Sequence, residues 1–275
     1  MLLYLDFDGT MFEPILGIPR SMYYNIRISR LIKKYHLPFV ISTGRRHWKW
    51  FHRILLRLLF LPDPDMLVIS VGSKIFVKKG NKYELDQRWE DHLAASDWAP
   101  DTITPVFKEI LDENDISYTF IREETHVIRA NLIMTPFTKI ELVQKHLQRI
   151  LPPSVSYTLT EKIRLTNSHT VFTGEFLIIN GRAGKDNALE YLLTTYYTHV
   201  DSCLIAGDAT LDTSMLLKRY SSKIPFFRLG VNLQPHARDI LEKSHNPKVS
   251  IYPKYGSRAL YETILRVVHP KGVQK

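Results

Sequence analysis

Cysteine is nearly absent from this 275-residue chain, since Cys203 is the one example. No disulfide can therefore form within the chain, which fits a reducing compartment. Long apolar runs are also missing: the most lipophilic stretch, Ile54–Leu61, is interrupted by Arg57 and is too short to span a bilayer. The first ten residues, MLLYLDFDGT, lack the basic leading region of a signal peptide. These absences lead us to expect a cytoplasmic protein without a membrane partner.

The charge of the chain is strongly positive, with a formal net charge of +9, while 44% of the residues are hydrophobic and 24% are charged. Such a composition is typical of a globular protein, and the positive surface attracts anions such as nucleic acids or phosphorylated small molecules. The segment Arg45–Arg53 mixes basic and aromatic residues, as single-strand binders do. We favour an amphipathic helix whose aromatic side chains face the core, and expect no nucleic-acid partner.

Short apolar runs alternate with helical patterns in the first third of the chain. The expected strands are Leu2–Phe7, Phe39–Ser42 and Met66–Val71, with a helix over Ser21–Tyr35 and another after Arg45. The last third repeats this order, with expected helices Lys185–Tyr197 and Thr213–Tyr220 and expected strands Ser202–Ala206 and Pro225–Val231. The alternation predicts an α/β fold with a parallel sheet covered by helices.

The middle of the chain has short helical and strand-like pieces in place of this regular alternation, which favours an inserted α+β domain. Its expected helical and strand-like pieces are Thr104–Leu111, Tyr118–Ile121, His126–Met134, Thr138–Ile150 and Val155–Thr160. We therefore predict a core made of residues 1–84 and 175–275, interrupted by a second domain over residues 85–174.

Two carboxylates, Asp6 and Asp8, lie where the first expected strand ends, in the sequence DFDGT. Residues two apart on an extended backbone point the same way. An aspartate can attack a phosphate ester and form an aspartyl phosphate, while a second carboxylate can donate a proton to the leaving oxygen. Taken alone, the string is equally compatible with an acidic turn.

Two further segments carry groups that bind anions. Thr43 and Gly44 follow the second strand, where a hydroxyl and backbone amides at a helix start can contact a phosphoryl oxygen. Lys185 opens a helix after Gly184 and supplies a point charge for a phosphate or an anionic nucleophile. Each segment has a simpler interpretation by itself, as a helix cap or as a solvated lysine.

Asp208 and Asp212 follow the expected strand Ser202–Ala206 in the sequence GDATLD. Mg²⁺ takes one or two carboxylates together with waters and phosphate oxygens. Asp6, the backbone carbonyl of Asp8, and Asp208 form such a set, with Asp212 as a further ligand or an outer partner. Because ligands bind at the carboxyl ends of parallel strands, we expect all four segments to converge in one Mg²⁺-dependent site.

Together, DFDGT, Thr43-Gly44-Arg45, Gly184-Lys185 and GDATLD resemble the four motifs of haloacid dehalogenase (HAD) superfamily phosphatases. The resemblance implies a Rossmann-like core with an inserted type-2 cap. It also implies that Asp6 is the nucleophile and Asp8 the acid/base, that Thr43 and Lys185 bind phosphate, and that Asp208 and Asp212 belong to the metal site. The segments around Gly72, Trp89 and Arg182 resemble the sucrose-phosphate phosphatase branch, whose relatives act on sugar phosphates.

These observations predict a Mg²⁺-dependent phosphatase for a small phosphorylated sugar. Two alternatives stay open. The basic segment Arg45–Arg53 suggests a nucleic-acid end phosphatase on the same core. Ala209 and Leu211 stand where the HAD pattern has polar residues, which suggests a non-catalytic binding module, although such a module does not need the nucleophile. The sequence makes no prediction about the oligomeric state.

Overall fold

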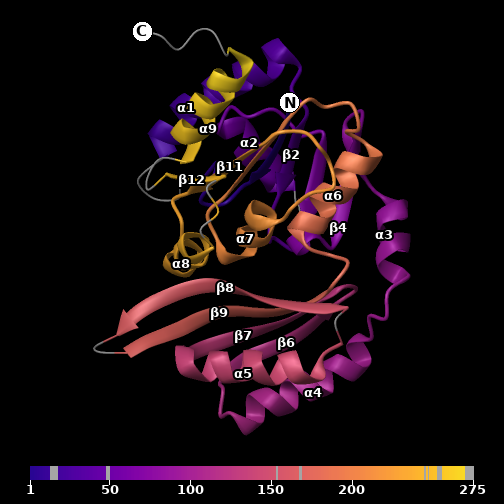
Figure 1. Ribbon diagram of the computed structural model, residues 1–275, viewed down its shortest axis with the longest axis vertical. Helices are drawn as coiled ribbons and strands as arrows, with labels where there is room; N and C mark the ends of the chain where they lie inside the picture. Colours follow the sequence, from indigo (N-terminus) through magenta and orange to yellow (C-terminus); the bar gives the residue numbers. More distant parts are fainter. Residues whose placement is uncertain are drawn as a thin grey trace. The chain divides into compact units, whose positions relative to one another are not determined.

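The computed structural model describes residues 1–12, 18–47, 50–152, 154–166, 169–244, 246, 248–252 and 256–269. The chain divides into two compact units, shown in Figure 1. We call Met1–Asp86 with Lys185–Lys275 the core unit, and Gln87–Gly184 the inserted unit. No helix among the described residues is long and apolar enough to cross a membrane.

Within the described residues, the core unit is built on an eight-stranded sheet of order β12-β11-β10-β1-β2-β3-β4-β5. The strands from β12 to β3 in this order are parallel, and β4 and β5 add an antiparallel edge. The strand bounds are β1 Leu2–Asp6, β2 Phe39–Ser42, β3 Met66–Ile69, β4 Lys74–Lys79, β5 Lys82–Leu85, β10 Cys203–Gly207, β11 Phe226–Val231 and β12 Val249–Tyr252.

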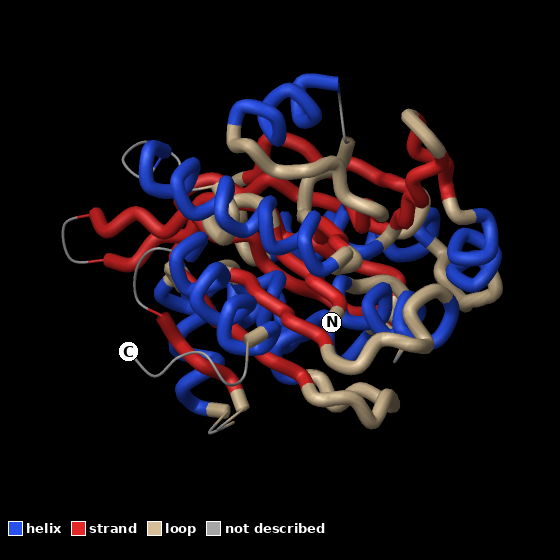
Figure 2. The backbone as a smooth tube through the Cα atoms, turned by 90° about the horizontal axis from the view of Figure 1, so that it is seen from above, coloured by secondary structure: helices blue, strands red, loops and turns tan. Residues whose placement is uncertain are grey.

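Helices lie on both sides of this sheet, as the blue and red segments of Figure 2 show. One group contains α1 and α9, which pack against each other, and a second group contains α6, α7 and α8. The helix bounds are α1 Ile18–Tyr35, α2 Trp50–Leu58, α6 Lys185–Thr195, α7 Thr210–Leu217, α8 Pro235–Lys243 and α9 Gly256–Val268.

The two faces of β1 explain how the sheet is covered. All five residues of β1 are buried, as expected for a strand between two helical layers. Leu3 and Leu5 belong to one apolar cluster with Ile28 of α1 and Leu260 of α9. Alternation along the strand turns Tyr4 to the other face, where its hydroxyl donates to the carbonyl of Lys185 in α6 at 2.7 Å.

The strand order reverses direction between β1 and β10. The chain runs from β1 through β2 to β3 on one side, and from β10 through β11 to β12 on the other. In open α/β sheets, ligands bind at the carboxyl ends of the strands at such a switch point. Asp6 is the last residue of β1 and Asp208 directly follows β10, so this topology brings the two carboxylates to the same crevice.

The inserted unit contains an antiparallel sheet of order β6-β7-β9-β8. Figure 1 shows α4 and α5 on one face of this sheet, and both helices contact β7. Its apolar cluster includes Phe107, Ile128 and Phe176. The bounds are α3 Gln87–Ala94, α4 Pro100–Glu113, β6 Tyr118–Glu124, β7 Val127–Pro136, α5 Phe137–Ile150, β8 Val155–Thr166 and β9 His169–Asn180.

Some element bounds differ from those expected from the sequence. β3 ends at Ile69, because Ser70 and Val71 turn the backbone to positive φ. Helix α7 begins at Thr210 rather than Thr213, since the carboxylate of Asp212 accepts the amide of Ala209 at 3.0 Å and caps the helix start. The chain returns to the core after Gly184 rather than Gly174, because β9 continues through the expected boundary.

We predict that Phe107→Ala destabilises the inserted unit by about 3–5 kcal/mol, the usual cost of emptying a phenylalanine site in a core. Phe107 is fully buried, and its ring centroid lies 5.3 Å from that of Phe176. Hydrogen exchange of β7 and β9, followed by mass spectrometry, measures the loss. Leu142→Ala is the matched control because Leu142 is 53% exposed, and protection of these strands equal in both variants would contradict the prediction.

Candidate active site

Lys185 lies between two carboxylates at the carboxyl edge of the core sheet. Its Nζ donates to Oδ1 of Asp6 and to Oδ1 of Asp212, each at 2.6 Å. The lysine is 2% exposed, Asp6 is 5% exposed and Asp212 is fully buried. A charge with so little solvent must be paired, so Lys185 fixes the orientation of both carboxylates.

The backbone at the start of α7 also holds Asp212. Its Oδ2 accepts the amides of Asp208 at 3.1 Å and of Ala209 at 3.0 Å. Asp212 is the third residue of α7, and its carboxylate accepts the amide of the residue before the helix, as the acidic residue of a capping box does. Asp212 is therefore well held although position 209 has no polar side chain. Leu211, the other departure from the HAD pattern, packs against Gly44, where an added Cβ would lie 3.0 Å from its Cδ1.

Asp208 is held by the loop that follows β1. The hydroxyl of Thr10 donates to Oδ1 of Asp208 at 3.3 Å, a contact that sequence reasoning missed although Thr10 belongs to the first motif. Gly9 has φ +80°, and an added Cβ there would lie 2.1 Å from Oδ2 of Asp208. Glycine is thus required by both its backbone conformation and the close approach of the carboxylate. Asn232, after β11, donates to the carbonyl of Gly9 at 3.0 Å.

Asp8 has a different partner from the other carboxylates. Arg45 donates from Nε to Oδ2 of Asp8 at 2.6 Å and from Nη2 to Oδ1 at 2.5 Å. This two-point contact fixes the plane of the carboxylate. Thr43 is 1% exposed, and its Oγ1 accepts the amide of Arg45 at 3.2 Å. Thr43 follows Ser42, which is the β2 partner of Asp6, so the first two motifs lie side by side.

Burial and like charges set the electrostatics of the cluster. Burial and the nearby negative charge of Asp212 raise the pKa of Asp6 to about 7, against the opposing effect of Lys185. Burial and the charges of Asp6 and Asp212 raise the pKa of Asp208 well above its usual range. Burial alone would lower the pKa of Lys185, but Asp212 and Asp6 outweigh it and raise that pKa.

The residues of the cluster fit a divalent metal ion. Ligand oxygens of Asp6, Asp208 and Asp212 all lie within 4.8 Å of one another. Three ionised carboxylates and one ammonium leave a formal charge of −2 in a buried site, which a divalent cation neutralises. Carboxylate oxygens are the donors that Mg²⁺ prefers. The side chain of Asp8, bound to Arg45, is not among these three carboxylates.

The other candidate segments divide between the described and undescribed parts of the chain. In the basic segment Arg45–Arg53, Arg45 contacts Asp8, whereas Trp48 and Lys49 lie outside the described residues, as do the side chains of residues 50–53. In the inserted unit, Arg129 is 4% exposed and donates to Glu124 and Glu175, each at 2.9 Å. These two ion pairs give Arg129 a structural role within its own sheet.

The fold and the family comparison together define the class of this protein, a HAD-type phosphatase. The family model for sucrose-6F-phosphate phosphohydrolase matches residues 1–113 and 143–224. The chain belongs to this family of sugar phosphatases. No sequence among the curated proteins matches the chain.

Solved structures share the same fold. The sucrose-phosphatase of Synechocystis, solved in complex with sucrose and phosphate, is 20% identical, with a TM-score of 0.68 and 97% of each chain covered. A HAD subclass IIB sugar phosphatase is 12% identical, with a TM-score of 0.59 over 97% of this chain and 98% of that one. The trehalose-6-phosphate phosphatase of Aspergillus fumigatus is 14% identical, with a TM-score of 0.51 over 85% and 83% of the two chains.

The raised pKa of Asp6 predicts how the metal-free protein responds to pH. The pKa of Asp6 is near its ordinary value of 3.8 in the unfolded chain and about 7 in the folded chain. Between these values the folded state binds more protons, so its stability falls as the pH rises. We expect the unfolding free energy in EDTA to fall more steeply from pH 4 to 7 in the wild type than in Asp6→Asn.

Urea unfolding at a series of pH values measures both slopes. The isosteric asparagine cannot ionise, and groups outside the cluster of Asp6, Asp208, Asp212 and Lys185 cancel in the comparison. Equal slopes for the two proteins would contradict the electrostatic description of the cluster.

Proposed function

We propose that this protein is a Mg²⁺-dependent phosphatase that hydrolyses small phosphorylated sugars through an aspartyl phosphate on Asp6. The observation that carries the proposal is the buried contact of Lys185 with Asp6 and Asp212, at the switch point of the sheet. Lys185 restrains one oxygen of Asp6, and the second oxygen attacks the phosphorus atom. A carboxylate held in this way loses little freedom on reaching the transition state.

In the first step, an oxygen of Asp6 forms a bond to phosphorus and the bond from phosphorus to the sugar oxygen breaks. Asp8, in its protonated form, gives a proton to the leaving oxygen, so one of its two contacts with Arg45 must open first. Asp8 lies two residues beyond Asp6, and the two-point contact with Arg45 orients its carboxyl group. The ammonium of Lys185 offsets the negative charge that gathers at the site.

In the second step, water attacks the aspartyl phosphate, and Asp8 takes the proton that the water loses. Inorganic phosphate leaves, Asp6 regains its carboxylate, and both side chains return to their starting protonation states. Asp6, Asp208 and the carbonyl of Asp8 would hold Mg²⁺, with Asp212 as an outer partner or further ligand. The bound ion would supply positive charge to the phosphate oxygens.

Thr43 and Gly44 complete the proposed phosphate site. Thr43 follows the strand residue that pairs with Asp6, so it lies beside the nucleophile at the same sheet edge. Its Oγ1 accepts the amide of Arg45, and a hydroxyl that accepts one bond can still donate another. We assign that donation to a phosphoryl oxygen. The same bond links Thr43 to Arg45, and through Arg45 to Asp8.

The substrate proposal rests on the family. The family model is that of sucrose-6F-phosphate phosphohydrolase, and the similar structures include phosphatases named for sucrose phosphate and trehalose 6-phosphate. A phosphorylated disaccharide is therefore the first substrate class to test.

The proposed compartment is the cytoplasm. The buried Cys203 is compatible with its reducing conditions.

We predict that Asp6→Asn lowers phosphate release from p-nitrophenyl phosphate by about 10³-fold or more, since it removes the attacking group. EDTA should abolish wild-type turnover, and added Mg²⁺ should restore it. Asp239→Asn is the matched control, because Asp239 lies on α8 in an exposed pair with Lys243. Turnover by Asp6→Asn at the wild-type rate would refute the proposed nucleophile.

A second prediction concerns the choice of substrate. We expect kcat/KM for sucrose 6F-phosphate or trehalose 6-phosphate to exceed that for p-nitrophenyl phosphate by about tenfold or more, because sugar contacts add binding energy in the transition state. A 5′-phosphorylated oligonucleotide serves as the competing substrate. Preferred hydrolysis of the oligonucleotide, with strong salt dependence, would instead favour a nucleic-acid end phosphatase.

A further inference from the structure

A pocket separate from the carboxylate cluster lies in the core unit, near the amino ends of strands β11 and β12. It has a volume of about 750 Å³, and its lining includes Phe226 and Lys248. Phe226 is the first residue of β11, and Lys248 directly precedes β12. Asp6 and Asp208, by contrast, stand at the carboxyl ends of β1 and β10. Because these strands are parallel, the pocket is separate from the candidate active site.

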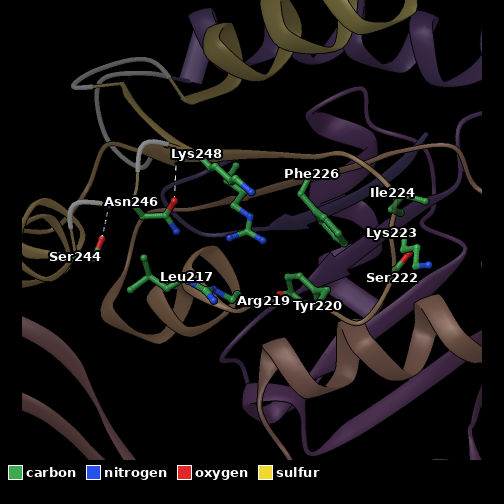
Figure 3. Close-up of a pocket in the computed structure, with 11 residues that line it drawn as sticks. Leu217, Arg219, Tyr220, Ser222, Lys223, Ile224, Phe226, Ser244, Asn246 and Lys248 are labelled. Atoms are coloured by element: carbon green, nitrogen blue, oxygen red, sulfur yellow. Dashed lines mark hydrogen bonds between the residues drawn. The ribbon is translucent and has the colours of Figure 1, made fainter.

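The lining of this pocket carries positive charge without a balancing carboxylate among its described residues. Arg219, Lys223, Arg228 and Lys248 all line it. Figure 3 shows Lys248 on one side and Lys223 on the other, with the rings of Tyr220 and Phe226 between them. Four cations around one cavity attract an anion, and the volume falls within the range of small-molecule sites.

Arg228 supplies the most specific sign of a ligand. It is 6% exposed, and it donates from Nη1 to the carbonyl of Leu216 at 3.0 Å and from Nη2 to that of Lys218 at 2.8 Å. Its Nε is buried and has no hydrogen-bond partner among the described residues. A buried charged group is costly when its charge is not balanced, and an anion bound in the pocket would offset the charge of this guanidinium.

The pocket also offers aromatic surface. The rings of Tyr220 and Phe226 stack with centroids 4.8 Å apart and an interplanar angle of 22°. The guanidinium of Arg228 lies 5.7 Å from the centroid of Tyr220 and 5.4 Å from that of Phe226. Leu217 and Ile224 add apolar lining. A ligand that fills the pocket thus needs a carbon body, preferably a ring, beside its charged group.

From these contacts we infer that the pocket is a second binding site, for a small organic phosphate with a ring in its body. The phosphate group contacts Arg228 and the surrounding basic side chains, and the ring lies against Tyr220 and Phe226. This site is independent of the proposed hydrolysis, and its ligand is bound rather than cleaved, because the described residues of the lining include no aspartate to act as a nucleophile.

The test compares phenylphosphonate with methylphosphonate, which carries the same head group without a ring. Calorimetry on the full chain in EDTA should give a Kd about tenfold lower for phenylphosphonate. The double variant Arg219→Gln/Lys223→Gln should weaken its binding at least tenfold, since both residues are exposed and line the pocket. Arg30→Gln/Lys33→Gln is the matched control, because it removes the same charge from exposed positions on α1.

Hydrogen exchange locates the bound probe, with increased protection expected over residues 218–226. Turnover of p-nitrophenyl phosphate should be equal in both double variants, which shows that they are folded. The inference is overturned if neither probe binds, if the two phosphonates bind equally, or if the two double variants bind phenylphosphonate with the same Kd.

Discussion

The contact of the Lys185 ammonium with Asp6 and Asp212 is the interaction on which the rest of the site depends. It joins the end of β1, the start of α6 and the start of α7 through two hydrogen bonds of 2.6 Å. Breaking a buried ion pair of this kind leaves an uncompensated charge and costs about 3–5 kcal/mol. One ammonium cannot neutralise three carboxylates, so the remaining negative charge is offset by protons, as the raised pKa values of Asp6 and Asp208 indicate, or by a bound cation.

The switch point of the sheet explains why this cluster forms. Parallel pairing places β10 directly beside β1, with Leu5 opposite Ala206. Asp6 and Asp208 then leave neighbouring strands at the same edge, although they are far apart in sequence. The loop after β1 is held by Thr10 and by the bond from Asn232 to Gly9, so the crevice is built from backbone turns as well as from charged side chains.

The parallel sheet and the four motifs could be predicted from the sequence, because buried strands are short apolar runs and the charged residues directly follow them. The bounds of β2 match the expected strand Phe39–Ser42. The partners of the site residues could not be predicted. Nothing in the spacing of Thr10, Asp212 or Arg45 indicates which atom each would contact, since such contacts depend on loop geometry that periodicity does not encode.

Ala209 is a second example of what the sequence could not predict about the site. In the sequence, a polar side chain is missing from the fourth motif, which suggested a non-catalytic binding module. In the structure two backbone amides hold Asp212, and this support does not depend on the residue type at position 209. The proposed nucleophile Asp6, its partner Lys185 and a well-held Asp212 are all present, which removes the main reason to regard the chain as a non-catalytic module.

Helix α7 connects this support to the opposite edge of the sheet. Asp212 accepts amides at its first turn, and Arg228 donates to the carbonyl of Leu216 in its last turn. An anion at the start of a helix and a cation at its end both interact favourably with the helix dipole. The eight-residue helix is therefore fixed at both ends by charged groups. An anion bound in the proposed pocket would contact the same Arg228 guanidinium that holds the end of α7.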